Sequence, residues 1–90
     1  MADIVTGSFA GTGQSNPIVA RKVHIAMDFA GTATVDIERR LPSGTWYKIA
    51  TSVTADYIQG FDFYAPTAVR LNCTAFTNAV EYVLQSGSEG

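Results

Sequence analysis

The chain has 90 residues, of which 47% are hydrophobic and 16% are charged, and its net charge is −2. This length fits one domain, residues 1–90, whose folding buries roughly 60–65% of the unfolded surface. The six basic residues are scattered along an acidic chain, which excludes nucleic acid as the main partner. Because soluble domains average about 25% charged residues, the weakly charged exterior favours packing against a neighbouring subunit.

Compartment and membrane association follow from the cysteine count and from the absence of long apolar runs. Cys73 is the only cysteine, so the fold needs no disulfide and no oxidising compartment. The residues after Met1 do not form a secretory signal, and no run approaches the roughly 18 apolar residues of a membrane span. We therefore expect synthesis in a cytoplasm and no membrane partner.

The first twenty residues predict a strand followed by an irregular segment. Residues 3–9 are rich in β-branched and aromatic side chains, and Gly7 interrupts them, as is typical of an edge strand. Residues 10–20 include the uncharged sequence Gly-Thr-Gly-Gln-Ser-Asn-Pro, which is too long for a tight hairpin. This segment is predicted to be an extended arm or a crossover, and an arm would be able to reach a neighbour.

Two alternating segments follow, at residues 22–29 and 32–40. The alternation predicts half-buried strands, and their closeness in sequence predicts that they pair antiparallel. The positions expected to face the core are Val23, Ile25, Met27, Phe29, Ala33, Val35 and Ile37, whereas His24, Asp28, Thr34, Asp36, Glu38 and Arg40 are expected to face solvent.

The segment at residues 32–47 predicts the central hairpin, with a turn at 41–44 and a strand at 45–53 that carries Trp46 near its start. In residues 56–64 the period is broken at Gly60, which indicates a bulge or bend between two short strands closed by Pro66. Residues 68–76 alternate again and are expected to form a last hairpin with 80–84.

No window of ten or more residues has the apolar spacing of an amphipathic helix. Instead, seven to eight short strands recur at roughly ten-residue intervals, which is typical of a sandwich or small barrel. The predicted fold class is all-β, a single small antiparallel β-sandwich of immunoglobulin-like or jelly-roll-like form.

Catalytic, metal and cofactor sites are not predicted. His24 has no Cys, Asp or Glu at ligand spacing, and Cys73 lies at an inward position with nothing nearby to activate it. Asp36 and Glu38 share a strand face about 7 Å apart, a spacing that resembles a glycosidase pair, but alternating charges on a solvated strand explain them better. We therefore expect no enzyme activity and no cofactor.

The aromatic residues offer two interpretations. Exposed rings would form a platform for sugars, whereas most rings of a small sandwich are needed to fill its core. We expect most of them to be core residues and leave Trp46 open, as a cap on the core or as an exposed ring. The residues concerned are Trp46, Tyr47, Tyr57, Phe61, Phe63 and Tyr64.

Several short motifs, in order along the chain, resemble the small β-sandwich virion proteins of tailed bacteriophages. The central turn differs from that of these relatives, because Leu41-Pro42-Ser43 stands where they have an acidic residue of a degenerate Asp-box. The motifs are Gly7-Ser8-Phe9, Gly11-Thr12-Gly13-Gln14-Ser15, residues 31–39, Gly44-Thr45-Trp46, residues 69–75 and residues 80–84.

The resemblance implies a non-enzymatic capsid decoration (cement) protein that binds the major capsid protein on the capsid surface of the virion and stabilises the shell. It implies a homo-oligomer, preferably a trimer, synthesised in the host cytoplasm. A glycan- or host-attachment domain of a head or tail fibre, with Trp46 and Tyr47 at a loop tip, is the alternative. The residues expected to contact partners are Gln14, Asn16, Ile18, Val19 and Trp46.

Overall fold

The computed structural model describes residues 4–86, so residue 3 of the first predicted strand and the tail at 87–90 lie outside the described residues. Within this range the chain forms strands and no helix, which confirms the all-β prediction. The seven strands are β1 (Ile4–Phe9), β2 (Gly13–Gln14), β3 (Ile18–Phe29), β4 (Ala33–Arg40), β5 (Trp46–Val53), β6 (Tyr57–Phe76) and β7 (Val80–Ser86).

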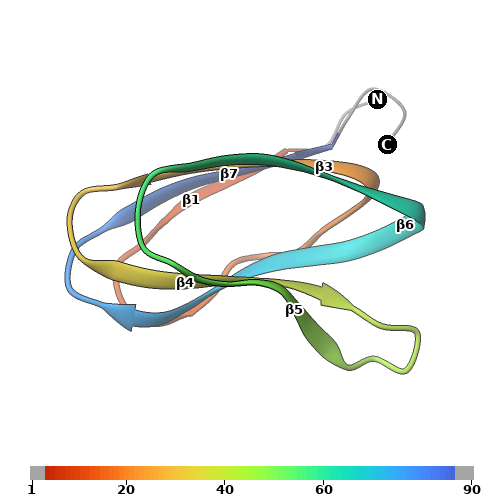
Figure 1. The fold of residues 1–90 in the computed structure, drawn as a ribbon, viewed down its shortest axis with the longest axis horizontal. Helices are drawn as coiled ribbons and strands as arrows, with labels where there is room; N and C mark the ends of the chain where they lie inside the picture. Colours follow the sequence, from red (N-terminus) through yellow and green to blue (C-terminus); the bar gives the residue numbers. More distant parts are fainter. Residues whose placement is uncertain (1–3, 87–90) are drawn as a thin grey trace.

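The strands form one antiparallel sheet in the order β1-β7-β3-β6-β4-β5, and β2 pairs with β6 off this path. The sheet folds over on itself because β6 belongs to both layers. Residues 57–62 and 67–69 of β6 pair with β3, whereas residues 69–76 pair with β4 on the other side and residues 72 and 73 pair with β2. Figure 1 shows β1, β3 and β7 in one group and β4 and β5 in the other, with β6 joining them.

The bend of β6 lies at residues 63–66. Ala20 pairs with Thr67 and Lys22 pairs with Asp62, so Arg21 alone lies opposite this unpaired bulge. Pro66 is accommodated here because the bulge requires no ladder hydrogen bond from its missing N–H. The predicted interruption at Gly60 is wrong, since Gly60 pairs with His24 inside the continuous strand.

Two of the predicted strand pairings are wrong. β3 and β4 do not pair, because the turn between them crosses from one layer to the other and each strand instead pairs with β6. Likewise, β7 forms no hairpin with β6 and lies between β1 and β3. The hairpin of β4 and β5 is present, and its turn is closed by a 2.8 Å hydrogen bond from Gly44 N to the Leu41 carbonyl.

The two crossing turns, at residues 30–32 and 77–79, are hydrogen-bonded to each other. The backbone N–H groups of Thr77 and Asn78 donate to the Thr32 carbonyl at 3.1 and 2.8 Å, and Thr32 N donates to Asn78 Oδ1 at 2.9 Å. A Cβ at Gly31 would collide with the Asn78 side chain. The close approach of the two turns therefore requires glycine at position 31.

The core lies between the two layers and confirms the inward positions predicted for β3 and β4, with Phe29 only partly buried. Of the inward positions that the alternation in residues 68–76 predicts, Val69, Leu71 and Cys73 are buried, whereas Ala75 is exposed, so its inward assignment is wrong. The buried apolar residues are Phe9, Ile18, Ala20, Val23, Ile25, Met27, Ala33, Val35, Ile37, Val69, Leu71, Cys73, Val80 and Leu84.

The segment at residues 10–20 runs from β1 to the second layer and back. Within it, β2 pairs with residues 72 and 73 of β6. Ser15 is buried, donates its backbone N–H to the Leu71 carbonyl at 2.8 Å, and accepts a hydrogen bond from Leu71 N on its hydroxyl at 2.9 Å. In this structure the segment is held against its own sandwich.

The contact between the crossing turns generates a stability prediction. Gly31→Ala should lower the free energy of unfolding by about 1 kcal/mol, because the new methyl group displaces Asn78 from its hydrogen bond with Thr32. Gly11→Ala is the matched control, since a Cβ at Gly11 meets nothing within 4 Å. Urea denaturation followed by Trp46 fluorescence measures both variants, and equal midpoints would contradict the role of Gly31.

Candidate functional site

A polar cluster occupies the outer face of the layer formed by β4, β5 and the second half of β6. We call Asp36, Glu38, Lys48, Arg70 and Asn72 the outer-face cluster. Asp36 and Glu38 point away from the core, as their alternation predicts, but they are only 4% and 6% exposed. The expectation that they lie on a solvated face is therefore wrong, because side chains of neighbouring strands cover them.

Glu38 is paired with two side chains of β6. Its Oε1 lies 2.8 Å from Arg70 Nε, and its Oε2 accepts a hydrogen bond from Asn72 Nδ2 at 3.3 Å. Glu38 and Arg70 are direct cross-strand partners, so the antiparallel register places them together. This carboxylate thus ties β4 to β6.

Asp36 ties β4 to β5 on the other side. Its Oδ2 lies 3.1 Å from Lys48 Nζ, and its Oδ1 accepts a 2.8 Å hydrogen bond from Ser52 N. Ser52 has a φ of 56°, in the left-handed region that is uncommon for serine, where β5 shifts its register against β4. The hydrogen bonds and ion pairs of the two carboxylates therefore connect β4 to its neighbouring strands β5 and β6.

Trp46 lies beside the same cluster. The Arg70 guanidinium carbon is 4.1 Å from the centroid of the indole ring, within cation–π distance, and the Trp46 side chain is partly buried. Trp46 is therefore neither of the two alternatives inferred from the sequence, since it covers an ion pair on the outer face. One face of its ring is occupied by Arg70.

The other aromatic residues divide into two sets. Tyr57, Phe61 and Phe63 are partly buried and pack against the core. Tyr47 and Tyr64 are exposed, and the expectation that such rings fill the core is wrong for both. Tyr64 projects from the bulge of β6, where the strand leaves its partner and alternation no longer predicts which side chain points inward.

The residues expected to contact partners are dispersed. Gln14 and Trp46 lie on the same layer, and Gln14 Nε2 reaches Asn72 Oδ1 at 3.4 Å. Asn16 is exposed, and Val19 is 56% exposed. Ile18 is 3% exposed and belongs to the core, because it faces inward from β3, so its assignment to a contact surface is corrected.

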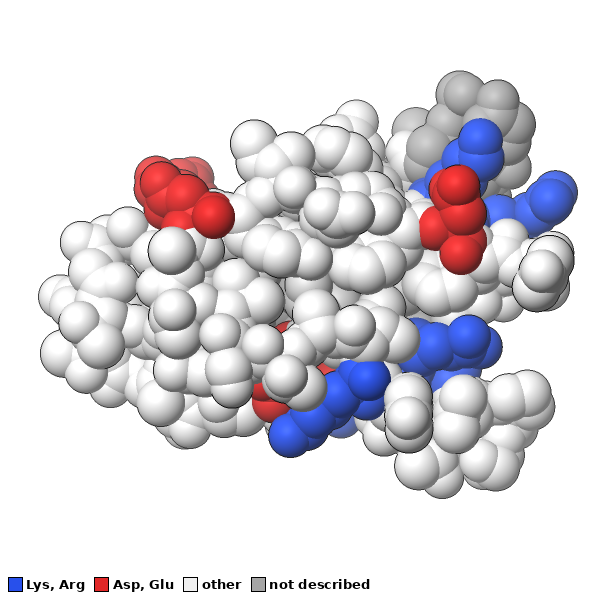
Figure 2. Space-filling view, viewed as in Figure 1, with Lys and Arg blue, Asp and Glu red and all other residues white. Residues whose placement is uncertain are grey.

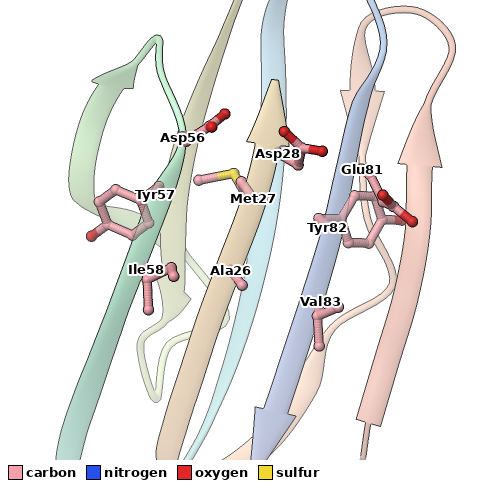
Figure 3. A pocket seen from close by; sticks show the side chains of 9 residues that line it. All are labelled: Ala26, Met27, Asp28, Asp56, Tyr57, Ile58, Glu81, Tyr82 and Val83. Carbon is pink, nitrogen blue, oxygen red and sulfur yellow. The ribbon is translucent and has the colours of Figure 1, made fainter. Parts of the chain in front are cut away.

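A groove lies on the other layer, across the ends of β6, β3 and β7, and Figure 3 shows the side chains that line it. Its volume is about 560 Å³, and three aliphatic side chains, Ala26, Ile58 and Val83, lie in one cross-strand row. The carboxylates of Asp28, Asp56 and Glu81 stand at one end. Sequence reasoning missed this groove because it requires β7 beside β3.

Two further residues singled out from the sequence lie apart from these surfaces. His24 is exposed on β3, and Cys73 is buried in the core as predicted. Within residues 4–86, no three His, Cys, Asp or Glu side chains gather into a group that could hold a metal ion. Nor does the described part contain a helix suited to crossing a membrane.

Comparison with known proteins defines the fold. The chain matches no protein-family model, and none of the curated proteins matches it in sequence. Its structure is similar to the crystal structure of the SPBc2 prophage-derived protein YomS, with a TM-score of 0.73 and 10% identity, over 94% of this chain and 93% of that one. At this identity the similarity establishes the shared fold.

A second similar structure is that of the Yersinia pseudotuberculosis-derived mitogen. The TM-score is 0.57 at 11% identity, and the match covers 100% of this chain and 89% of the mitogen. Both matches extend over nearly the whole of each chain, so the small all-β fold is shared as a complete unit.

The outer-face cluster generates a prediction about the two ion pairs. Arg70→Ala should lower the free energy of unfolding by about 2 kcal/mol, because it leaves the buried Glu38 carboxylate without its cation. Lys48→Ala should cost only about 0.5 kcal/mol, because the Lys48 side chain is 54% exposed, so water takes the place of its ammonium group, and Asp36 keeps its hydrogen bond from Ser52 N. Urea denaturation of both variants measures the difference, and similar losses would contradict this description of the cluster.

Burial of Cys73 generates a prediction about pH. Burial raises the pKa of the thiol above its ordinary value of 9.0, and a smaller, opposite effect comes from hydrogen bonding with the Ala75 backbone. The unfolded chain then loses the thiol proton first, so this stabilisation is complete below pH 9 and is lost as the pH rises through the folded-state pKa. Cys73→Ala should flatten the fall in stability above pH 9, and an unchanged pH profile would contradict this.

Proposed function

We propose that the chain is a non-enzymatic structural protein of a phage virion, a decoration (cement) protein that binds the major capsid protein on the outside of the shell. The observation that carries the proposal is the fold shared with a prophage-derived protein over 94% of this chain and 93% of the other. The motif resemblance to small phage virion proteins points in the same direction.

The surface of the described residues supports a role in assembly. Large apolar side chains are exposed at several places, among them Ile4, Val19 and Tyr47. β1 and β5 end the strand order, so each offers an unpaired strand edge within the described part of the chain. Apolar side chains and free strand edges are features that a binding partner covers.

Attachment to a host or glycan through Trp46 and Tyr47 has weaker support. A sugar ring stacks on the open face of an aromatic side chain, and the Arg70 guanidinium already covers one face of Trp46. Tyr47 is exposed but stands beside it on β5 without a second free ring on the same strand.

Stabilisation of particles tests the decoration role. Empty shells of the phage that encodes the chain should open at a higher temperature after the purified protein is added. A free protein concentration of 100 times the Kd stabilises the assembled shell by about 2.7 kcal/mol per binding site. Val19→Asp should bind the shells more weakly than Thr74→Asp, which places the same charge at another exposed strand position. Equal thermal stability of shells with and without the protein would overturn the proposal.

A further inference from the structure

The charges of the molecule are separated along its length. Figure 2 shows acidic side chains without basic ones at one end of this face, whereas the basic side chains lie toward the other end, with an acidic side chain among them. Asp36 and Glu38 are already neutralised by Lys48 and Arg70. The separation therefore leaves an acidic end and a predominantly basic end, which we call the basic end, on a body about 35 Å long.

The acidic end contains the groove described above, which we call the acidic groove. Ile58 in its apolar row is 73% exposed. Asp28 and Glu81 are exposed cross-strand partners, so two like charges lie directly opposite each other, an arrangement that destabilises a sheet. Asp56, also exposed, accepts a hydrogen bond from Phe29 N, and no ion pair of these three carboxylates is found within residues 4–86.

The basic end contains a feature with the opposite properties. At the bulge of β6, Tyr64 is 104% exposed, and Arg21 lies opposite the bulge on β3, also exposed. We call Tyr64 and Arg21 the aromatic knob. Asp62 lines one surface hollow with Arg21 and Lys22 and another with Tyr64, so the knob places a projecting ring near two cations and one carboxylate. The acidic groove instead combines an apolar floor with three carboxylates.

We propose that the chain associates with itself head to tail, the aromatic knob of one copy occupying the acidic groove of the next. The Tyr64 ring covers Ile58, and Arg21 neutralises the opposed carboxylates of Asp28 and Glu81. The favoured occupant is a second copy because the chain itself carries the complementary charge and the exposed ring. Such a contact joins two different surfaces, so it generates a closed ring, of which a trimer is one case, or an open filament.

Two single-site variants separate the two halves of this contact. Tyr64→Ala removes the knob and leaves the groove, whereas Ile58→Asp spoils the groove floor and leaves the knob. Both side chains are exposed, so folding should be preserved, as thermal unfolding of each variant would show. Tyr47→Ala is the matched control, because it removes another exposed tyrosine, from β5.

Sedimentation velocity of the purified full-length chain measures the association. The wild type and Tyr47→Ala should form oligomers that dissociate as salt rises, and each of the two other variants alone should associate at least tenfold more weakly. A mixture of Tyr64→Ala with Ile58→Asp should form one-to-one heterodimers, because one intact knob and one intact groove remain between them.

Three outcomes would overturn the proposal: a wild-type chain that is monomeric at about 100 μM, a concentration well above the Kd of a specific contact; variants that associate like the wild type; or a mixture that recovers no heterodimer. If the chain is monomeric and its groove binds shells, the occupant of the groove is another protein and not a second copy. The inference does not rest on the proposed function, because shell binding is measured separately.

Discussion

The structure depends on one strand taking part in two layers. β6 pairs with β3 along residues 57–62 and 67–69 and with β4 from residue 69 onward, and the strand bends at the bulge of residues 63–66 between its two stretches of pairing with β3. Without that bend, the apolar faces of β3 and β4 would not oppose each other, and the core between Ile25 and Ile37 would not close. The position of Pro66 agrees with this role, because a proline in an unpaired bulge leaves no ladder hydrogen bond unmade.

Local alternation predicted a large part of this fold. The inward positions of β3 and β4 were correct because a period of two residues specifies which side chains share a face. Strand partners were not predictable in the same way. Gly31 and Asn78 are 47 positions apart, and only their contact shows that two apparent hairpin turns are crossings between layers. Nearness in sequence favours a hairpin, and here the need to close a two-layer core outweighs it.

The candidate surfaces also depend on contacts between residues that are distant in sequence, which local patterns do not predict. Asp36 and Glu38 were predicted on the correct face but were expected to be solvated. The residues next to them in sequence do not indicate that Lys48, Arg70 and Trp46 cover them. The apolar row of the groove assembles Ala26, Ile58 and Val83 from three strands. Each is unremarkable in its own segment, and the groove exists only once β7 is known to lie beside β3.

The pairing of β1 with β7 has a consequence for how the protein is made. Ile4 pairs with Gln85, so the first strand cannot complete its hydrogen bonds until the last strand has left the ribosome. Among the strand pairs formed by residues 4–86, only the hairpin of β4 and β5 is local in sequence. Folds dominated by distant pairings close slowly and expose unpaired strands meanwhile. The domain should therefore complete its structure only after β7 has emerged, when β1 and β7 are free to pair.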